Sequence, residues 1–223
     1  MLRFSESDHL RISAAVSAAE TASDGEIVTI VATRSDSYHD VALHWALLAM
    51  FLVLALVATV PDFFLGLLDR ADGWTHEYSR EALLGLLLML LAAVFLLGRG
   101  ILAWTPLRLA LTPRATKARR VRRRAISFFA VGTERRTEAR VGVLLYLSLA
   151  EHQAEIVADA AIHGKVAPEC WGETMAALIE AVRDGRPGDG MAAAVERIGA
   201  VLAQHFPKTL ADRNELPDRL IEL

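Results

Sequence analysis

Residues 41–60 read VALHWALLAMFLVLALVATV, a stretch without a charged side chain in which eleven residues are Leu, Val or Phe. Residues 82–98, ALLGLLLMLLAAVFLLG, are also uncharged and again hold eleven such residues. On a scale of insertion free energy, each set contributes on the order of −3 to −7 kcal/mol. Extended to Trp104, the second stretch covers about 23 residues, enough to cross a bilayer with some tilt. The sequence therefore predicts a hairpin of two membrane spans, at 41–60 and 82–104.

Charged residues are distributed unevenly around these spans. The connector at 61–81 holds five acidic side chains and only two basic ones. After the second span come eight cations with no acid before Glu134: Arg108, Arg114, Lys117, Arg119, Arg120, Arg122, Arg123 and Arg124. Because basic flanks stay in the cytoplasm, we predict a protein of the cell (inner) membrane with both termini cytoplasmic and the connector outside.

Composition sets further bounds on the class of protein. The apolar fraction is 53% and is concentrated between residues 41 and 107, while the net charge of −3 by itself implies no polyanionic partner. The chain has one cysteine, Cys170, which excludes an intramolecular disulfide and a multi-cysteine zinc site. A single free cysteine packs like a small hydrophobic residue, so we expect Cys170 to be buried.

The remaining sequence alternates between helix and strand patterns. A capping box, Ser5-x-x-Asp8, predicts a helix over 6–22 whose inner face holds Leu10, Ile12, Val16 and Ala19. Strands are expected where β-branched or apolar runs occur, at 26–33, 141–150 and 153–162. Further helices are expected at 113–130, 168–183 and 189–205, followed by a polar, loosely held tail.

This order of elements predicts an α/β fold with a three- or four-stranded sheet covered by helices. An isolated 40-residue helix and strand could not bury its own core, so the strand at 26–33 must pair with strands more than 100 residues later. The predicted domains are accordingly 1–40 and 108–206 as two parts of one fold, 41–107 as an inserted membrane hairpin, and 207–223 as the tail.

Three segments resemble the TPM domain family: GEIVTIVATRSDSYHD at 25–40, RVGVLLYLSLAEHQAEIVADAAI at 140–162, and GDGMAAAVERIGAVLAQHFP at 188–207. The resemblance implies an α/β/α sandwich around a small mixed sheet and a role in assembling or repairing membrane complexes. It also implies that acid phosphatase activity and calcium binding occur in some members. The chain departs from the family pattern at its membrane hairpin, at Glu138-Ala139-Arg140 and at Ala158-Asp159-Ala160, and family domains mostly lie outside the cytoplasm.

The densest set of titratable groups follows the apolar run at 141–150. Alternation along a strand that starts at Gln153 would place Glu155 and Asp159 on one face, with His152 and His163 near its ends. Paired carboxylates with histidine can act as acid and base or hold a divalent cation such as Ca²⁺ or Mg²⁺. The predicted metal ligands are Asp159, as the first, with Glu155 and His163. The predicted catalytic groups are Asp159, Glu155 and His152. The alternative is a solvated outer face of an edge hairpin.

Two smaller groupings have structural alternatives. Asp40 and His44 share a helix face beside His39, which suits a proton- or metal-sensitive site or else hydrogen bonding at the membrane interface. The loop at 184–189, DGRPGD, resembles an oxygen-rich turn, although Asp189 also suits a helix N-cap.

The helix at 113–130 begins with seven cations in eleven residues. Its position ten residues past a span favours docking on anionic lipid over binding of nucleic acid, and each contact contributes about 1 kcal/mol. The predicted docking residues are Arg114, Lys117, Arg119, Arg120, Arg122, Arg123 and Arg124. We therefore predict a membrane-anchored interaction or assembly module with a membrane protein partner. The alternative is a metal-dependent phosphatase that uses the carboxylates of the 151–163 hairpin.

Overall fold

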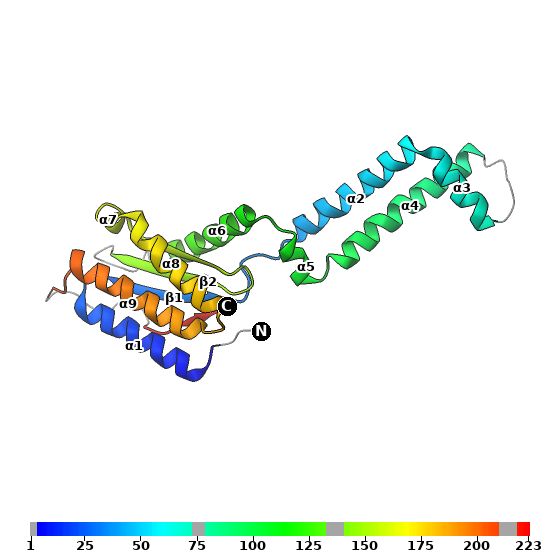
Figure 1. Ribbon diagram of the computed structural model, residues 1–223. Helices are drawn as coiled ribbons and strands as arrows, with labels where there is room; N and C mark the ends of the chain where they lie inside the picture. Colours follow the sequence, from blue (N-terminus) through cyan, green and yellow to red (C-terminus); the bar gives the residue numbers. More distant parts are fainter. Residues whose placement is uncertain (1–3, 73–78, 133–140, 210–217) are drawn as a thin grey trace. The chain divides into compact units, whose positions relative to one another are not determined.

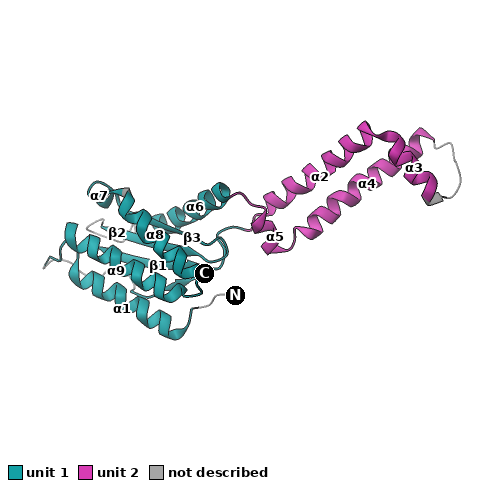
Figure 2. Cartoon of the chain, in the orientation of Figure 1, with its two compact units in different colours: residues 1–36, 114–223 teal, residues 37–113 magenta. Residues whose placement is uncertain are grey.

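Two compact units make up the chain in the computed structural model, which describes residues 4–72, 79–132, 141–209 and 218–223. Residues 1–36 and 114–223 form unit 1, and residues 37–113 form unit 2 (Figure 2). Unit 1 is thus built from two stretches of chain, with unit 2 inserted between them. Glu77, Glu134 and the Glu138-Ala139-Arg140 segment lie outside the described residues.

Unit 1 contains a four-stranded sheet in the order β3-β2-β1-β4 among the described residues. β1 (Glu26–Ala32) pairs in parallel with β2 (Gly142–Ser148), in full register from end to end. β3 (Gln153–Ala158) runs antiparallel to β2, and β4 (Ile221–Glu222) runs parallel to β1. The predicted small mixed sheet is confirmed, including the pairing of the first strand with a strand more than 100 residues later.

Helices cover both faces of the sheet and make unit 1 an α/β/α sandwich (Figure 1). Successive side chains of a strand point to opposite faces, so a strand between two helical layers is apolar throughout. All seven residues of β1 and all seven of β2 are buried. On one face Ile27, Val31, Val143 and Leu145 pack with α1 (Glu6–Ala22), α8 (Pro168–Arg183) and α9 (Pro187–His205). On the other face Val28, Ile30, Leu144 and Tyr146 pack with α6 (Arg114–Gly132).

Local sequence signals set most helix boundaries. The capping box of α1 is present, because the Asp8 N–H donates to the Ser5 hydroxyl and the Ser5 N–H donates to the Asp8 carboxylate. Proline begins α8 and α9, where its missing N–H has no partner to lose. In α6, Val121, Ala125 and Phe129 recur every four residues and form its buried face.

Three expected element boundaries are wrong. The strand expected at 153–162 ends at Ala158, and Asp159 is the N-cap of a short helix, α7 (Ala160–His163). α9 begins at Pro187, so Asp189 lies in its first turn and is not the N-cap. The end of the expected loose tail is held in the sheet, because Ile221 pairs with Ile30. A strand of two residues is too short to show a periodic pattern in the sequence.

Two expected burials are also wrong. Leu10 is 68% exposed, because the inner stripe of α1 runs through Ile12, Val16 and Ala19. Cys170 is exposed near the start of α8, beside the buried Trp171. A free thiol on the surface is available to labelling reagents.

Glycine allows α9 to approach its neighbours closely. A Cβ atom on Gly199 would lie 2.5 Å from the Cβ atom of Ala19 in α1, and one on Gly190 would lie 2.6 Å from the Cβ atom of Ala181 in α8. Both distances are shorter than real carbon contacts. The small residues therefore set how closely α1 and α8 can pack on either side of α9. This close packing holds the three-helix layer together.

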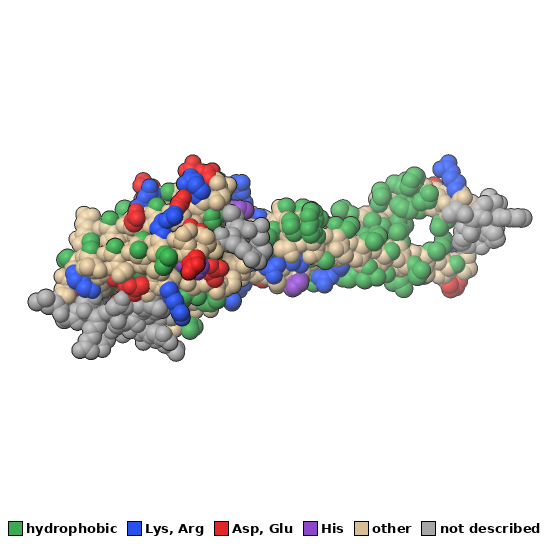
Figure 3. All heavy atoms as spheres, turned by 90° about the horizontal axis from the view of Figure 1, so that it is seen from below, with side chains coloured by type: hydrophobic (Ala, Val, Ile, Leu, Met, Phe, Trp, Pro, Cys, Tyr) green, Lys and Arg blue, Asp and Glu red, His purple; other side chains and the backbone are tan. Residues whose placement is uncertain are grey.

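Unit 2 consists of four helices in the described residues: α2 (His39–Thr59), α3 (Pro61–Asp72), α4 (Arg80–Ile101) and α5 (Thr105–Ala110). α2 and α4 are long and apolar enough to cross a membrane, with a mean hydropathy of 2.5 each. They lie side by side, and Gly98 of α4 faces Ala46 of α2. Hydrophobic side chains dominate the visible surface of this unit (Figure 3). The acidic connector contains the amphipathic helix α3, and Trp104 caps α5 and does not extend α4.

Glu20 is a buried acid at the end of α1. Its side-chain oxygen accepts the N–H of Ile27 at 3.0 Å, at the start of β1. Burial raises the pKa of Glu20 to about 8, and the nearby Glu26 and Asp218 carboxylates add to this effect. At neutral pH the folded protein therefore holds this side chain protonated, whereas the unfolded chain ionises it near its ordinary value.

Stability should accordingly fall as the pH rises from about 5 to 8, because over that range only the folded state keeps the Glu20 proton. E20Q keeps an oxygen to accept the Ile27 N–H but cannot ionise. We expect it to be more stable than the parent at pH 8.5 by about 1–3 kcal/mol and equally stable at pH 5. Thermal unfolding of the full chain in detergent across this pH range measures the difference. E6Q, at an exposed position of the same helix, is the control, and equal pH profiles for E20Q and the parent would contradict the assignment.

Candidate functional site

Polar side chains gather where the parallel strands β1 and β2 end. Glu151, in the turn after β2, is buried, and its carboxylate accepts the Ser35 N–H at 3.0 Å and the Ser148 hydroxyl. The hydroxyls of Ser35 and Tyr146 share a hydrogen bond of 3.0 Å. Glu151 thus ties the turn to the segment that follows β1. The carboxyl ends of parallel strands are the usual ligand-binding edge of an α/β sheet.

A pocket of about 280 Å³, termed the turn pocket, opens beside this turn. His152 adopts a left-handed backbone conformation, with φ of 48°, which turns the chain sharply between β2 and β3. Cationic side chains reach the pocket from two helices that are distant in sequence, α6 and the end of α8. Its lining residues are Arg114, Lys117, Glu151, His152, Gln153 and Arg183.

The cations of α6 point in several directions. Arg120 is largely buried and forms an ion pair of 2.8 Å with Asp36, so this predicted lipid-docking residue is engaged within unit 1. Arg122 lies 3.9 Å from Glu155, and Arg124 lies over the ring of Phe128. Arg119 and Arg123 are exposed on the side away from the sheet. Lipid docking by α6 stays a prediction, carried by fewer residues than the seven in the sequence pattern.

Glu155 lies on the α6 face of β3, opposite Tyr146 of β2. Its side chain is 17% exposed, and burial raises its pKa above the ordinary value, while the Arg122 guanidinium opposes that shift. A half-buried carboxyl with a raised pKa has the properties of a general acid. Among the described residues Glu155 is not joined by two further acidic, histidine or cysteine ligands.

Asp159 has a structural position beyond the end of β3. Its carboxylate accepts the Gly142 N–H at 2.7 Å, and its own N–H donates to the Gly142 carbonyl at 3.0 Å. These two bonds clamp the start of β2 to the end of β3. Glu155 and Asp159 are therefore separated by about 13 Å of strand and turn and do not converge on one ion.

The two predicted histidines lie at opposite ends of this hairpin. His152 is exposed in the turn before β3, whereas His163 is exposed at the end of α7. Within the described ranges no group of three His, Cys, Asp or Glu side chains is arranged to hold a metal ion. The predicted calcium or magnesium site at Asp159, Glu155 and His163 is thus not assembled by these residues.

The other two groupings make contacts within their own units. In unit 2 the His44 ring nitrogen Nδ1 lies 2.6 Å from the backbone carbonyl oxygen of Asp40. The His39 ring nitrogen Nδ1 lies 3.4 Å from a guanidinium nitrogen of Arg108. In unit 1 Asp184 pairs with Arg186 at 3.0 Å. A histidine bonded to its own helix backbone is held in place without a metal, which favours the structural alternative for Asp40 and His44.

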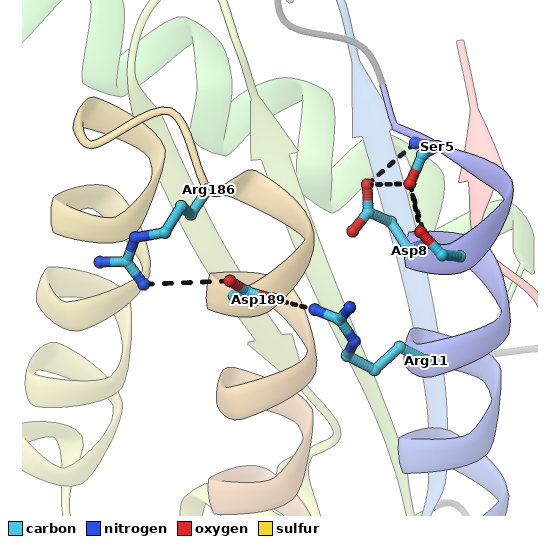
Figure 4. A network of polar contacts seen from close by, with 6 residues as sticks. Ser5, Asp8, Arg11, Arg186 and Asp189 are labelled. Atoms are coloured by element: carbon cyan, nitrogen blue, oxygen red, sulfur yellow. Dashed lines mark hydrogen bonds and ion pairs between the residues drawn. The ribbon is translucent and has the colours of Figure 1, made fainter.

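A network of polar contacts joins the N-terminal ends of α1 and α9 (Figure 4). Asp189 of α9 pairs with Arg11 of α1 and faces Arg186. Hydrogen bonds from Ser5 lower the pKa of Asp8 and keep it ionised at the start of α1, where negative charge is favoured. The groove beside this network, of about 350 Å³, is lined by acids and bases that largely pair with one another. The network therefore serves packing of α1 on α9.

Comparison with known proteins identifies a domain in the second half of the chain. The sequence matches the TPM domain over residues 107–201, which covers α6, β2, β3, α8 and most of α9. The chain carries a TPM domain. An NMR structure of the BA42 protein from the psychrophilic bacterium Bizionia argentinensis has a similar fold, with a TM-score of 0.55 at 17% identity over 99% of this chain and 95% of that chain. A comparison with curated proteins finds no match.

The sequence does not reveal the polar cluster of unit 1 at the ends of β1 and β2. Ser35, Tyr146 and Arg183 are not singled out by the sequence pattern, and Glu151 enters it only as one of the titratable groups of the 151–163 hairpin. One signal was available, because SDS at 35–37 and AEH at 150–152 both follow apolar strands. Parallel pairing of those strands brings the two segments to one edge, but the direction of pairing was not determined by the sequence.

Asp159→Ala should destabilise the TPM domain by about 1–3 kcal/mol, because the buried Gly142 N–H loses its acceptor. Asp159→Asn keeps an oxygen that can accept the Gly142 N–H, so it should lose less stability than Asp159→Ala. Thermal unfolding of the full chain in detergent measures both, with His163→Ala as an exposed control expected within about 0.5 kcal/mol of the parent. An Asp159→Ala variant as stable as the parent would show that the clamp is unimportant.

Proposed function

We propose that this chain is a two-span protein of the cell membrane whose TPM domain acts in the cytoplasm as an interaction or assembly module for a membrane protein complex. The observation that carries the proposal is the apolar surface of α2 and α4. Only 11% of the most apolar window of α2 and none of that of α4 is buried within the protein. Side chains such as Phe51, Leu88 and Met89 would otherwise remain in contact with water.

The alternative explanation for apolar helices, a soluble core, has little support. A core helix is mostly buried by its own protein, and a surface helix keeps a polar face. α2 and α4 have neither property, because they are exposed and uncharged along their central turns. A hydrocarbon environment satisfies both helices, since all their backbone hydrogen bonds are internal.

The distribution of charge supports the orientation. The described part of the connector carries Asp62, Asp69 and Asp72 on α3, whereas α6 carries a dense set of cations after the second apolar helix. Cationic flanks are retained in the cytoplasm. This supports a cytoplasmic position for unit 1, which contains both ends of the chain.

The outward face of α6 supports docking on anionic lipid. Arg119 and Arg123 are exposed one turn apart, and Ile126 on the same side is 46% exposed. Cations with an apolar side chain beside them match the headgroup region, where charge meets hydrocarbon. Each arginine near the surface contributes about 1 kcal/mol. The TPM domain would thereby present its remaining surface to a membrane partner, with no role for nucleic acid.

Metal-dependent phosphatase activity is the second candidate, and Glu155 is the observation that favours it, through its half-buried position and raised pKa. The separation of Glu155 from Asp159 and His163 favours the interaction module. Turnover of a phosphomonoester with Mg²⁺ or Ca²⁺ that disappears in Glu155→Gln, with the fold intact, would establish this second candidate in its place. Glu155 is the better position for that test, because removal of Asp159 also breaks the clamp on Gly142.

A topology map tests the membrane arrangement. We expect green fluorescent protein to fluoresce and alkaline phosphatase to be inactive when each is fused after Leu223. The reverse should hold when each is inserted in the connector between α3 and α4. Both reporters at both positions provide the matched controls. Phosphatase activity at the C-terminus would place α6 outside the cell and contradict both the orientation and lipid docking on the cytoplasmic leaflet.

Purification tests the assembly role. After crosslinking in intact membranes and extraction in mild detergent, a tagged full-length chain should retain a membrane protein in fixed stoichiometry. A two-span protein of unrelated sequence with the same tag is the control for non-specific capture. Recovery of only the abundant proteins that the control also recovers would argue against an assembly module.

A further inference from the structure

The turn pocket contains cations that the fold does not neutralise. Arg114 and Lys117 line it from α6, and Arg183 lines it from the last turn of α8. Among the described residues none of these three forms an ion pair, in contrast to Arg120 and Arg122 of the same helix. Like charges brought together without a counter-charge repel one another. An anion bound between them would remove that repulsion.

The one carboxylate among the residues that line the pocket offsets only part of this positive charge. Both oxygens of Glu151 accept hydrogen bonds within the fold, from the Ser35 N–H and from the Ser148 hydroxyl, and the residue is 5% exposed. Its charge reduces the positive lining only in part. The three exposed or half-exposed cations leave two positive charges in excess over Glu151, and the side chains of His152 and Gln153 add hydrogen-bonding groups.

We propose that the turn pocket binds a phosphate group. Guanidinium groups form paired hydrogen bonds with phosphate oxygens, and the lysine ammonium supplies a compact charge beside them. The excess of two positive charges matches a phosphate monoester dianion. A volume of about 280 Å³ accommodates the phosphate and the first atoms of whatever carries it. Arg114 begins a 19-residue helix, so the positive end of the helix dipole adds to the attraction.

The chain itself favours a lipid headgroup as the source of the phosphate. Arg114 follows the last residue of α4, Ile101, by 13 positions, which even in extended form reach no more than about 45 Å. If α4 spans the bilayer as proposed above, the pocket is within reach of the headgroups. A phosphomonoester lipid such as phosphatidic acid would then hold the TPM domain at the membrane. This choice of source rests on the proposed function, whereas phosphate binding by the pocket does not.

Binding to the detergent-solubilised full chain tests the inference. Native mass spectrometry measures adducts with phosphatidic acid and with phosphatidylglycerol, and calorimetry measures inorganic phosphate. We expect phosphatidic acid to bind in preference to phosphatidylglycerol, because only the former carries a phosphomonoester. Arg183→Gln should weaken binding of phosphatidic acid about tenfold, since one charge-assisted contact is lost. Lys117→Gln, on the other helix, should weaken it similarly.

Arg197→Gln is the matched control, because it removes the same charge from an exposed position of α9 without touching the turn pocket or the outward face of α6. Its affinity for phosphatidic acid should stay within about twofold of the parent, and circular dichroism should show all three variants folded. Binding of inorganic phosphate that Arg183→Gln weakens, together with equal binding of the two lipids, would support a phosphate site in the pocket whose ligand is a soluble phosphate and not a lipid. Equal binding by the parent, Arg183→Gln and Lys117→Gln would overturn the inference. Because detergent removes orientation, a failed topology map would leave these results unchanged.

Discussion

The parallel pairing of β1 with β2 is the constraint on which the rest of the structure depends. β1 consists of seven buried residues, so it is stable only with a neighbouring strand and a helical layer on each face. Its partner begins at Gly142, beyond unit 2 and α6. Lengthening a crossover from about 30 to 110 residues adds only about 1 kcal/mol of closure entropy. A helical hairpin can therefore stand inside the crossover without preventing the sheet from forming.

The same pairing determines where the chain leaves and re-enters unit 1. The exit follows β1 and reaches Asp36, and the return begins at Arg114 in the first turn of α6. The ion pair between Arg120 and Asp36 joins these two segments at 2.8 Å in a half-buried position. It fixes the start of the basic helix near the carboxyl ends of β1 and β2. The turn pocket lies there because the Glu151 turn is bonded to Ser35 on the exit segment.

Strong local signals made much of the fold predictable. Seven apolar residues in succession identified β1, a capping box identified α1, and prolines marked the starts of α8 and α9. What failed depended on contacts between distant residues. Asp159 ends β3 because Gly142 of another strand offers it two hydrogen bonds, and β4 is a strand only because β1 has an open edge. The candidate site was missed for the same reason, since Arg183 joins Arg114 only after α8 has packed on the sheet.

The basic run of α6 shows how helix geometry divides a uniform sequence into separate roles. Seven cations in eleven residues cannot all face one surface, because each residue turns the side chain by 100° about the axis. Arg114 and Lys117, three positions apart, reach the turn pocket together. Arg120 turns to Asp36 and Arg122 to Glu155, while Arg119 and Arg123 share the outer side. A count of charges therefore overstates how many side chains of such a helix can contact lipid. The cations that form no ion pair within the fold are the ones that can bind a ligand.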